Sequence, residues 1–190
     1  MTRSLAVFLT ALAALSAYAT GVGLKPGLWE VRVVKQVVDG QDMTAQRAAQ
    51  AAKMQQTMAA MPPEQRAKME AMFKQNGVSQ GSDGGYRLCI SAEMAQRDTP
   101  IVDKDGRCQP AKVIHSGNHT TYEFSCSSNG ITTVGKGETT AAGDLITTRS
   151  DMTMTRANGP PRVMHNESEM KYLGSDCGGL KPLAPPEHPQ

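Results

Sequence analysis

Two neighbouring stretches of the chain decide its fold. Residues 145–156 read Leu-Ile-Thr-Thr-Arg-Ser-Asp-Met-Thr-Met-Thr-Arg, and residues 162–173 read Arg-Val-Met-His-Asn-Glu-Ser-Glu-Met-Lys-Tyr-Leu. In the second stretch, every other residue from Met164 to Tyr172 falls on one face. The opposite face carries His165, Glu167, Glu169 and Lys171. This period of two predicts adjacent strands of an antiparallel sheet that packs on one face and meets water on the other.

The sequence on both sides of these stretches extends the sheet. The turn signals Ser116-Gly117-Asn118 and Ala142-Gly143-Asp144 separate further apolar and Thr-rich segments, so the second half should form a meander. Near the start, Trp29, Val31 and Val33 alternate with charged residues and predict an opening strand. The other predicted strands span residues 86–90, 109–115, 119–126, 131–140, 145–156 and 162–173.

The segment between the opening strand and the meander has a different character. From Met43 to Lys74 it is rich in Ala, Gln, Met, Lys and Glu, all of which favour helices. Pro62-Pro63 interrupts it, and proline is tolerated only in a first helical turn, so we predict helices over 44–60 and 63–75. Their methionines would form apolar stripes at helical spacing: Met54, Met58, Met61, Met69 and Met72.

These patterns predict a mainly β (α+β) fold, an antiparallel meander or incomplete barrel with an inserted helical hairpin at about 44–75. Residues 1–19 have the basic start, apolar run and Ala17-Tyr18-Ala19 close of a signal peptide cleaved after Ala19. Residues 20–177 would then form a single β-rich domain, and the Pro-rich residues 178–190 a flexible tail. We expect a periplasmic or secreted protein that does not span a membrane after signal cleavage.

The composition excludes several classes of protein. The 190 residues are 39% hydrophobic and 20% charged, which is too mixed for a disordered chain and too polar for an integral membrane protein. The net charge is only +2. A nucleic-acid binder would concentrate positive charge on one face, so we expect no nucleic-acid partner.

The cysteines of the chain are Cys89, Cys108, Cys126 and Cys177. An even number in an exported protein predicts two disulfides, and no pair has the CxxC spacing of a zinc site. A three-residue hairpin loop centred on Gly117 would place Cys108 opposite Cys126.

A two-residue Gly117-Asn118 turn gives a competing register for the same hairpin. It would pair Val113 with Tyr122 and put Cys108 and Cys126 on different faces. The two arguments conflict, and the sequence leaves both registers open. Of the three possible connectivities we favour Cys108 with Cys126 and Cys89 with Cys177.

Two groups of side chains are weak candidates for holding a metal. His115 and His119 flank the hairpin turn and could face one another, but the sequence places no further ligand nearby. Exposed turn histidines are the simpler interpretation. The Met stripes could bind copper(I), which favours thioethers, but helix packing is the simpler interpretation. We predict no metal site and no cofactor.

No catalytic motif is present, whether Gly-x-Ser-x-Gly, His-Glu-x-x-His, a P-loop or a dinucleotide fingerprint. The expected function is a non-catalytic periplasmic module for an apolar ligand or a partner segment, and the candidate partners are an apolar ligand and an envelope protein. The Met stripes would provide its adaptable surface beneath a helical lid. The alternative is a periplasmic copper- or metal-handling protein that uses the stripes and the turn histidines.

Several motifs together resemble a known family. They are Lys25-Pro26-Gly27-Leu28-Trp29-Glu30-Val31, the run Met-Pro-Pro-Glu-Gln-Arg-Ala-Lys-Met-Glu-Ala-Met over 61–72, Cys89-Ile90-Ser91, Ser116-Gly117-Asn118, and Leu173-Gly174-Ser175-Asp176-Cys177. They resemble domain-of-unknown-function family 3617, small exported proteins of Gram-negative bacteria, over nearly all of the chain after the signal peptide. Ser175 is an extra residue in the usual Gly-Asp-Cys close. The resemblance implies export, disulfides and a β-rich fold, and it transfers no catalytic residue.

Overall fold

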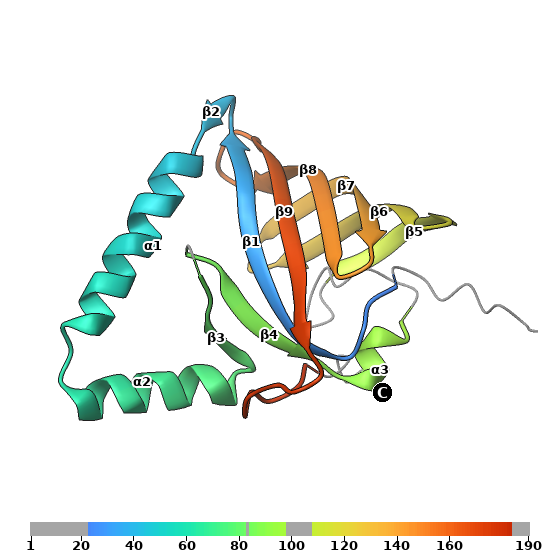
Figure 1. Ribbon diagram of the computed structural model, residues 1–190. Coiled ribbons are helices and arrows are strands. Elements are labelled where there is room, and N and C mark those ends of the chain that lie inside the picture. Colours follow the sequence, from blue (N-terminus) through green and yellow to red (C-terminus); the bar gives the residue numbers. More distant parts are fainter. Residues whose placement is uncertain (1–22, 83, 98–107, 184–190) are drawn as a thin grey trace, which may run out of the picture.

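The computed structural model describes residues 23–82, 84–97 and 108–183. The predicted signal peptide over 1–19 and the last seven residues of the predicted tail, 184–190, lie outside these ranges. The described residues form one curved antiparallel sheet with two long helices beside one end of it (Figure 1).

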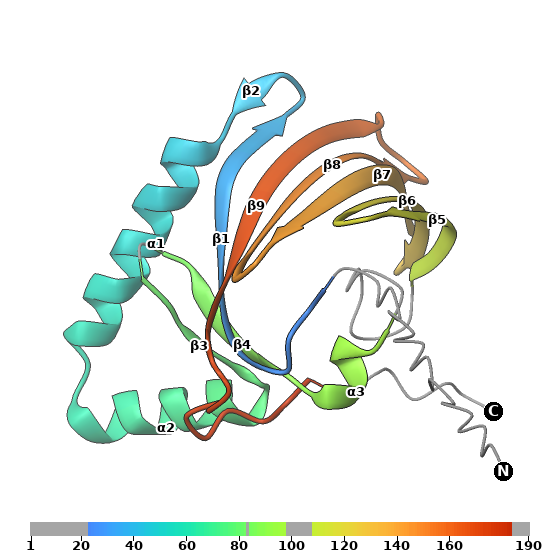
Figure 2. The same cartoon turned by 45° about the vertical axis from the view of Figure 1, so that its right-hand side comes forward.

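Nine strands and three helices make up the described structure. The strands are β1 (Gly27–Val38), β2 (Gln41–Asp42), β3 (Val78–Gln80), β4 (Tyr86–Ile90), β5 (Cys108–Ser116), β6 (His119–Ser128), β7 (Ile131–Ala142), β8 (Leu145–Arg156) and β9 (Arg162–Gly174). The helices are α1 (Thr44–Ala59), α2 (Pro63–Gln75) and α3 (Ala92–Ala95). The predicted mainly β fold with a helical insertion is confirmed, and the sheet is not closed. The two inserted helices diverge from the loop between them in Figure 2 and do not lie side by side as a hairpin. β2 and β3 were not predicted, because two or three residues are too few to show a period.

The sheet runs in the order β3-β4-β1-β9-β8-β7-β6-β5, with β2 paired to β1 alone. The second half of the chain is therefore a meander, as predicted. The opening strand β1 lies between β4 and β9, so it joins the first and last parts of the chain. Figure 2 shows the resulting curvature, with α3 beneath the concave side.

The core lies on the concave side, against one end of the meander. Its centre is formed by Trp29, Ile90, Met94 and Ile146, none more than 5% exposed. The indole N–H of Trp29 donates to the carbonyl of Lys25 at 2.8 Å, so the one polar atom of this side chain is satisfied. The short helix α3 follows β4. The Ser91 hydroxyl caps it by accepting from the Met94 N–H at 3.0 Å, and this holds Met94 in the core.

Two glycines of β7 make room for aromatic rings on the same face of the sheet. A Cβ atom on Gly137 would lie 2.5 Å from the Tyr122 ring, and one on Gly135 would lie 2.6 Å from the Phe124 ring. Both rings are at most 7% exposed. The Tyr122 and Phe124 rings of the neighbouring strand β6 thus pack directly on the backbone of these glycines. This close approach explains why glycine occurs within a strand here.

The structure pairs Cys89 with Cys177 and Cys108 with Cys126, the connectivity that the sequence favours. The β5–β6 hairpin satisfies both of the competing registers. Near the turn, Ser116 lies opposite His119 and Val113 opposite Tyr122, as for a two-residue turn. A bulge between Pro110 and Lys112 then shifts the register by one residue and brings Cys108 opposite Cys126.

The predicted flexible tail is packed over its described part. Leu180 is only 6% exposed, and Leu183 forms a parallel bridge with Ile90. The Leu183 N–H donates to the Cys89 carbonyl at 2.7 Å. The disulfide to Cys177 brings this segment beside β4, so apolar residues between its prolines find a surface that a sequence window does not show.

Candidate functional site

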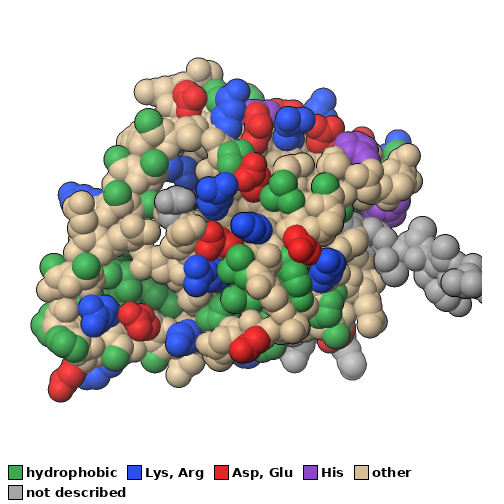
Figure 3. Space-filling model, viewed as in Figure 1, with side chains coloured by type: hydrophobic (Ala, Val, Ile, Leu, Met, Phe, Trp, Pro, Cys, Tyr) green, Lys and Arg blue, Asp and Glu red, His purple; other side chains and the backbone are tan. Residues whose placement is uncertain are grey.

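A broad groove lies between α1 and the sheet. It encloses about 690 Å3, and the space-filling view shows the molecule hollowed between α1 and the sheet (Figure 3). The wall is mostly apolar and comes from β1, the residues around α1, the β3–β4 turn, and the ends of β8 and β9. Its apolar side chains are Val31, Val33, Val38, Met43, Ala48, Ala51, Met54, Tyr86, Met154 and Met164.

A bulge in β1 decides which side chains reach this groove. Val33 lies opposite Ser168 and Lys35 opposite Glu167, so Val34 is an extra residue. Beyond it the inward and outward positions exchange. As a result Gln36 and Val38 face the groove, while Lys35 turns to the outer, convex face of the sheet.

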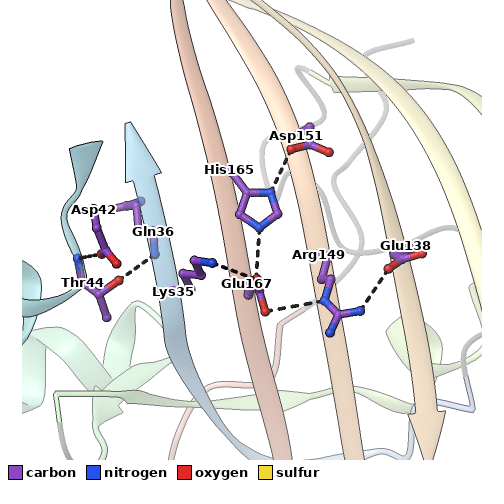
Figure 4. A network of polar contacts seen from close by, with 9 residues as sticks. All are labelled: Lys35, Gln36, Asp42, Thr44, Glu138, Arg149, Asp151, His165 and Glu167. Carbon is purple, nitrogen blue, oxygen red and sulfur yellow. Dashed lines mark hydrogen bonds and ion pairs between the residues drawn. The ribbon is translucent and has the colours of Figure 1, made fainter. Parts of the chain in front are cut away.

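Gln36 joins α1 to the sheet at one end of the groove. Its backbone N–H donates to Thr44 Oγ1 at 3.0 Å, and its side-chain Oε1 accepts from Arg47 Nη1 at 3.1 Å. On the other side, Gln36 Nε2 donates to Asn166 Oδ1 at 3.4 Å. The start of α1 is held further by Asp42, whose Oδ1 accepts from the Thr44 N–H at 2.8 Å (Figure 4). The hydrogen bonds from Thr44 hold the pKa of the Asp42 carboxyl below its usual value.

The charged side chains in the described part of the groove wall are all arginines. Arg32 pairs with Glu169 at 3.0 Å and Arg162 with Asp39 at 2.9 Å, so each has an acidic partner outside the groove wall. Arg47 has no ion pair among the described residues, and its side chain donates a hydrogen bond to Gln36. Among the described residues, the groove wall is therefore mostly apolar, and Arg47 is its one charged side chain without an ion pair.

Tyr86 carries the only phenol in the described wall of the groove. Burial raises the pKa of the Tyr86 hydroxyl, and the nearby positive charge of Arg47 acts in the opposite direction. The hydroxyl is therefore neutral near pH 7 and can donate a hydrogen bond into the groove.

The opposite face of the sheet carries rows of paired charges. Glu138, Arg149, Glu167 and Lys35 lie directly opposite one another across β7, β8, β9 and β1, and we call them the charged row. Arg149 Nη1 lies 3.4 Å from Glu138 Oε1, and Arg149 Nε lies 3.5 Å from Glu167 Oε2 (Figure 4). Basic and acidic side chains are interleaved over this surface in Figure 3. Such pairs keep an outward sheet face soluble and specify strand register.

His165 lies beside the charged row and contacts two carboxylates. Its Nδ1 is 2.8 Å from Asp151 Oδ1 and its Nε2 is 3.1 Å from Glu167 Oε1. The hydrogen bond to Asp151 raises the pKa of the imidazole, and the bond to Glu167 acts in the same direction. The bond from His165 lowers the pKa of the Glu167 carboxyl. Both ring nitrogens of His165 are engaged with carboxylates, so we interpret this group as a stabilising network.

The predicted Met stripes divide between two places. Met54 is 58% exposed and lines the groove. Met58 is 7% exposed and lines a smaller hollow of about 190 Å3 with Phe73, where α1 and α2 meet β3. Met61 and Met69 are half-buried, and Met72 is 52% exposed on α2. The stripe hypothesis therefore applies to the groove through Met54 alone.

The most informative groove residues were missed by sequence reasoning. Met43, Met154 and Met164 reach the groove from three different parts of the chain, and Gln36 does so only because of the bulge. The doubled valines Val33-Val34 in an otherwise alternating strand are the one signal that could have suggested a change of face. Nothing in the sequence near Arg47 distinguishes it from other exposed helix residues.

The structure does not bring the two turn histidines together. His115 lies opposite Thr120 on the face that carries Tyr122, and its Nδ1 is 2.9 Å from Thr120 Oγ1. His119 is on the other face, where its Nδ1 is 3.1 Å from Thr140 Oγ1. His119 and Thr120 are adjacent on β6, and adjacent positions on a strand point to opposite faces of the sheet. Because His115 is on the same face as Thr120, the two imidazoles lie on opposite faces and cannot share a ligand. Within the described ranges, no three His, Cys, Asp or Glu residues are grouped to hold a metal ion.

None of the described helices is sufficiently long and apolar to cross a membrane.

Comparison with known proteins places this chain among uncharacterised relatives. The model of the family described as protein of unknown function (DUF3617) matches residues 24–177. A Pseudomonas putida protein titled "Uncharacterized protein in lpd-3 5'region" is 35% identical over 104 residues, which cover 54% of this chain and 69% of that protein. No solved structure matches the chain.

Proposed function

The chain belongs to the DUF3617 family, and we propose that it is a non-catalytic periplasmic binding module that holds an apolar ligand or a partner segment in the groove between α1 and the sheet. One observation carries this proposal. Four methionines, Met43, Met54, Met154 and Met164, line one open groove together with valines of β1. Methionine is flexible and polarisable, so a Met-lined surface adapts to apolar shapes.

The size and position of the groove support a binding role. Its volume of about 690 Å3 lies within the range of ~300–1,000 Å3 that is typical of small-molecule sites. Met54 is 58% exposed and lines the groove, so its side chain is accessible to an occupant. An occupant would bury Met54 against the valines of β1.

The chemistry of the groove wall favours binding over catalysis. Within the described residues its polar side chains are arginine, glutamine, threonine and one tyrosine. No described residue of the wall supplies an imidazole, thiol or carboxylate as a general base beside the Thr44 hydroxyl. These groups can orient a ligand by hydrogen bonds but are poorly suited to move a proton.

The two disulfides support the proposed location. Disulfides persist in oxidising compartments such as the bacterial periplasm. The signal-peptide pattern of residues 1–19 agrees with this, and we propose that the protein acts there after cleavage.

A neutral apolar dye, N-phenyl-1-naphthylamine, tests the binding role with a pair of matched variants. Ala48 lines the groove, whereas Ala49 is exposed on α1 and does not line it. The wild-type protein should enhance the fluorescence of the dye, Ala48→Trp should abolish this by filling the groove, and Ala49→Trp should leave it unchanged. Equal binding by both variants, or no binding by the wild type, would refute the proposal.

Copper(I) handling is the second candidate, and one observation favours it. The four groove methionines bring thioethers from four separate segments into one wall, and soft thioethers select copper(I). The double variant Met54→Leu with Met164→Leu separates the candidates because leucine keeps the apolar volume and removes the sulfur. A binding module for apolar ligands keeps its dye affinity in this variant, whereas a copper protein loses copper(I) affinity in a competition titration.

A further inference from the structure

We infer that the ligand of the groove is a long-chain alkyl carboxylate, with its head held by Arg47 and its chain lying along the methionines and valines. This inference rests on the proposed function, and it names the class of ligand. Three properties of the groove support it: its charge, the way Arg47 is held, and the apolar path that begins beside Arg47.

The charge of the groove favours a ligand with one negatively charged group. Its described wall contains three arginines and no carboxylate, and two of the arginines are neutralised from outside the wall by Glu169 and Asp39. Of these three arginines, Arg47 alone has no acidic partner among the described residues. A single carboxylate carries one negative charge and matches this surplus. A phosphate monoester carries close to two and would exceed it.

Arg47 is held in a position to bind a carboxylate. Gln36 Oε1 accepts from Arg47 Nη1 at 3.1 Å, and Gln36 is itself tied to Thr44 and Asn166. A guanidinium has five N–H donors in a planar fork, so one bond to Gln36 leaves enough donors for a two-pronged contact with a carboxylate. Because Gln36 fixes the side chain before a ligand arrives, less rotamer freedom is lost on binding.

The apolar part of the groove starts at the same place. Gln36 Nε2 lies 3.5 Å from the sulfur of Met164, so the polar anchor and the thioether wall adjoin. Val31 and Val33 continue the wall along β1, and Met54 continues it along α1. An acidic head beside Arg47 therefore places an alkyl tail against methionine and valine. A peptide segment would instead bring backbone polar groups against the methionines and valines, which cannot form hydrogen bonds with them.

Binding of three amphiphiles with one common tail tests the inference. Dodecanoate, 1-dodecanol and dodecyltrimethylammonium are titrated below their micelle concentrations against the dye-loaded protein, and displacement is measured. Wild-type protein should bind dodecanoate about 10- to 100-fold more tightly than 1-dodecanol, as expected for a charge-assisted contact, and the cation most weakly. Dodecyl phosphate serves as a fourth arm and should bind no more tightly than dodecanoate.

Two variants that each remove one positive charge from α1 test whether Arg47 causes the preference for dodecanoate. Arg47→Gln should lose this preference for dodecanoate and retain its 1-dodecanol affinity, which also shows that it is folded. Lys53→Gln removes the same charge from the same helix outside the groove wall and should behave as the wild type. Equal binding of dodecanoate and 1-dodecanol by the wild type, or tighter binding of dodecyl phosphate, would overturn the inference while leaving the proposed function intact. Failure of the wild type to bind dye and all four amphiphiles would overturn both.

Discussion

The meander and the helical bracket, α1 with α2, differ in how they are held. Strands β6 to β9 are paired with neighbours along nearly their whole length, and the charged row crosses three of them. By contrast α1 has one buried residue, Met58, and α2 has none among its residues. Continuous pairing makes the meander a rigid frame. The bracket keeps a surface available beside that frame, which is the arrangement that a binding groove requires.

One disulfide lies next to the helical bracket and the other lies within the β5–β6 hairpin. Cys89–Cys177 joins β4, next to the bracket, to the end of the chain, over a separation of 88 residues, whereas Cys108–Cys126 closes 18 residues within a hairpin. Replacing both residues of the first bridge by alanine should lower the free energy of unfolding by about 4.5 kcal/mol, and of the second by about 3 kcal/mol, since a longer loop gains more entropy when opened. Urea unfolding of the two double variants measures this order. The reverse order would mean that the hairpin, not the link to β4, limits stability.

The same substitution at two methionines tests the comparison directly. Met94 is 5% exposed in the core under the meander, and Met72 is 52% exposed on α2. Met94→Ala should lower the free energy of unfolding by about 2–5 kcal/mol, because it leaves a cavity among Trp29, Ile90 and Ile146. Met72→Ala should change it by less than about 0.5 kcal/mol. Similar losses in chemical denaturation would show that the bracket contributes to the cooperative core.

A pair of glycines tests how tightly the meander is packed. Gly137→Ala places a Cβ atom against the Tyr122 ring and near the Arg149 carbonyl, so it should lower the free energy of unfolding by about 1–3 kcal/mol. Gly159 lies in the turn before β9 with nothing within 4 Å of the corresponding position, and Gly159→Ala should change stability by less than about 0.5 kcal/mol. Differential scanning calorimetry compares the two variants. A neutral Gly137→Ala would contradict the close packing of Tyr122.

The smallest expected effect is the pH dependence due to His165. Because the folded-state pKa of His165 is raised above its usual 6.5, this group stabilises the fold below that pH, and the contribution is lost as pH rises through the folded-state pKa. The lowered pKa of Glu167 has the opposite consequence: its contribution is present above pH 4.5 and is lost as pH falls through the folded-state pKa. The pair should therefore stabilise most between pH 4.5 and 6.5.

Urea midpoints measured at several pH values check this expectation. His165→Gln should flatten the fall in stability between pH 6 and pH 8 that the wild type shows. His115→Gln serves as the control, because His115 contacts the hydroxyl of Thr120 and not a carboxylate. Parallel profiles for the wild type and His165→Gln would show that the ion pairs of His165 do not influence stability.

Sequence reasoning predicted the local elements accurately and the groove poorly. The helices were expected over 44–60 and 63–75 and span 44–59 and 63–75, because helix propensity and proline act within a few residues. The groove depends on residues from β1, β4, β8, β9 and α1, which no short window contains. Of the five methionines in the predicted stripes, only Met54 lines the groove. Which helical methionines face the sheet depends on how the helices are placed against it, and the helical spacing does not contain that information.

The hairpin that joins Cys108 to Cys126 shows the same limit at small scale. Two valid local arguments gave registers that differ by one residue, and a bulge at 110–112 satisfies both. A bulge costs little locally, so alternation in one strand does not reveal it. It becomes favourable only when the partner strand and the disulfide are both in place.

The sequence by itself determined the alternating strands, the two helices and their proline break, the turns and the even set of cysteines, because each of these depends on interactions between residues close in the chain. Only the tertiary structure decided that β1 lies between β4 and β9, that Val34 bulges, and that Gln36 and Arg47 meet beside Met164. Strand order and bulge position depend on pairing between residues more than a hundred positions apart. Their free energy is set by packing and hydrogen bonding across that distance, which no local pattern contains.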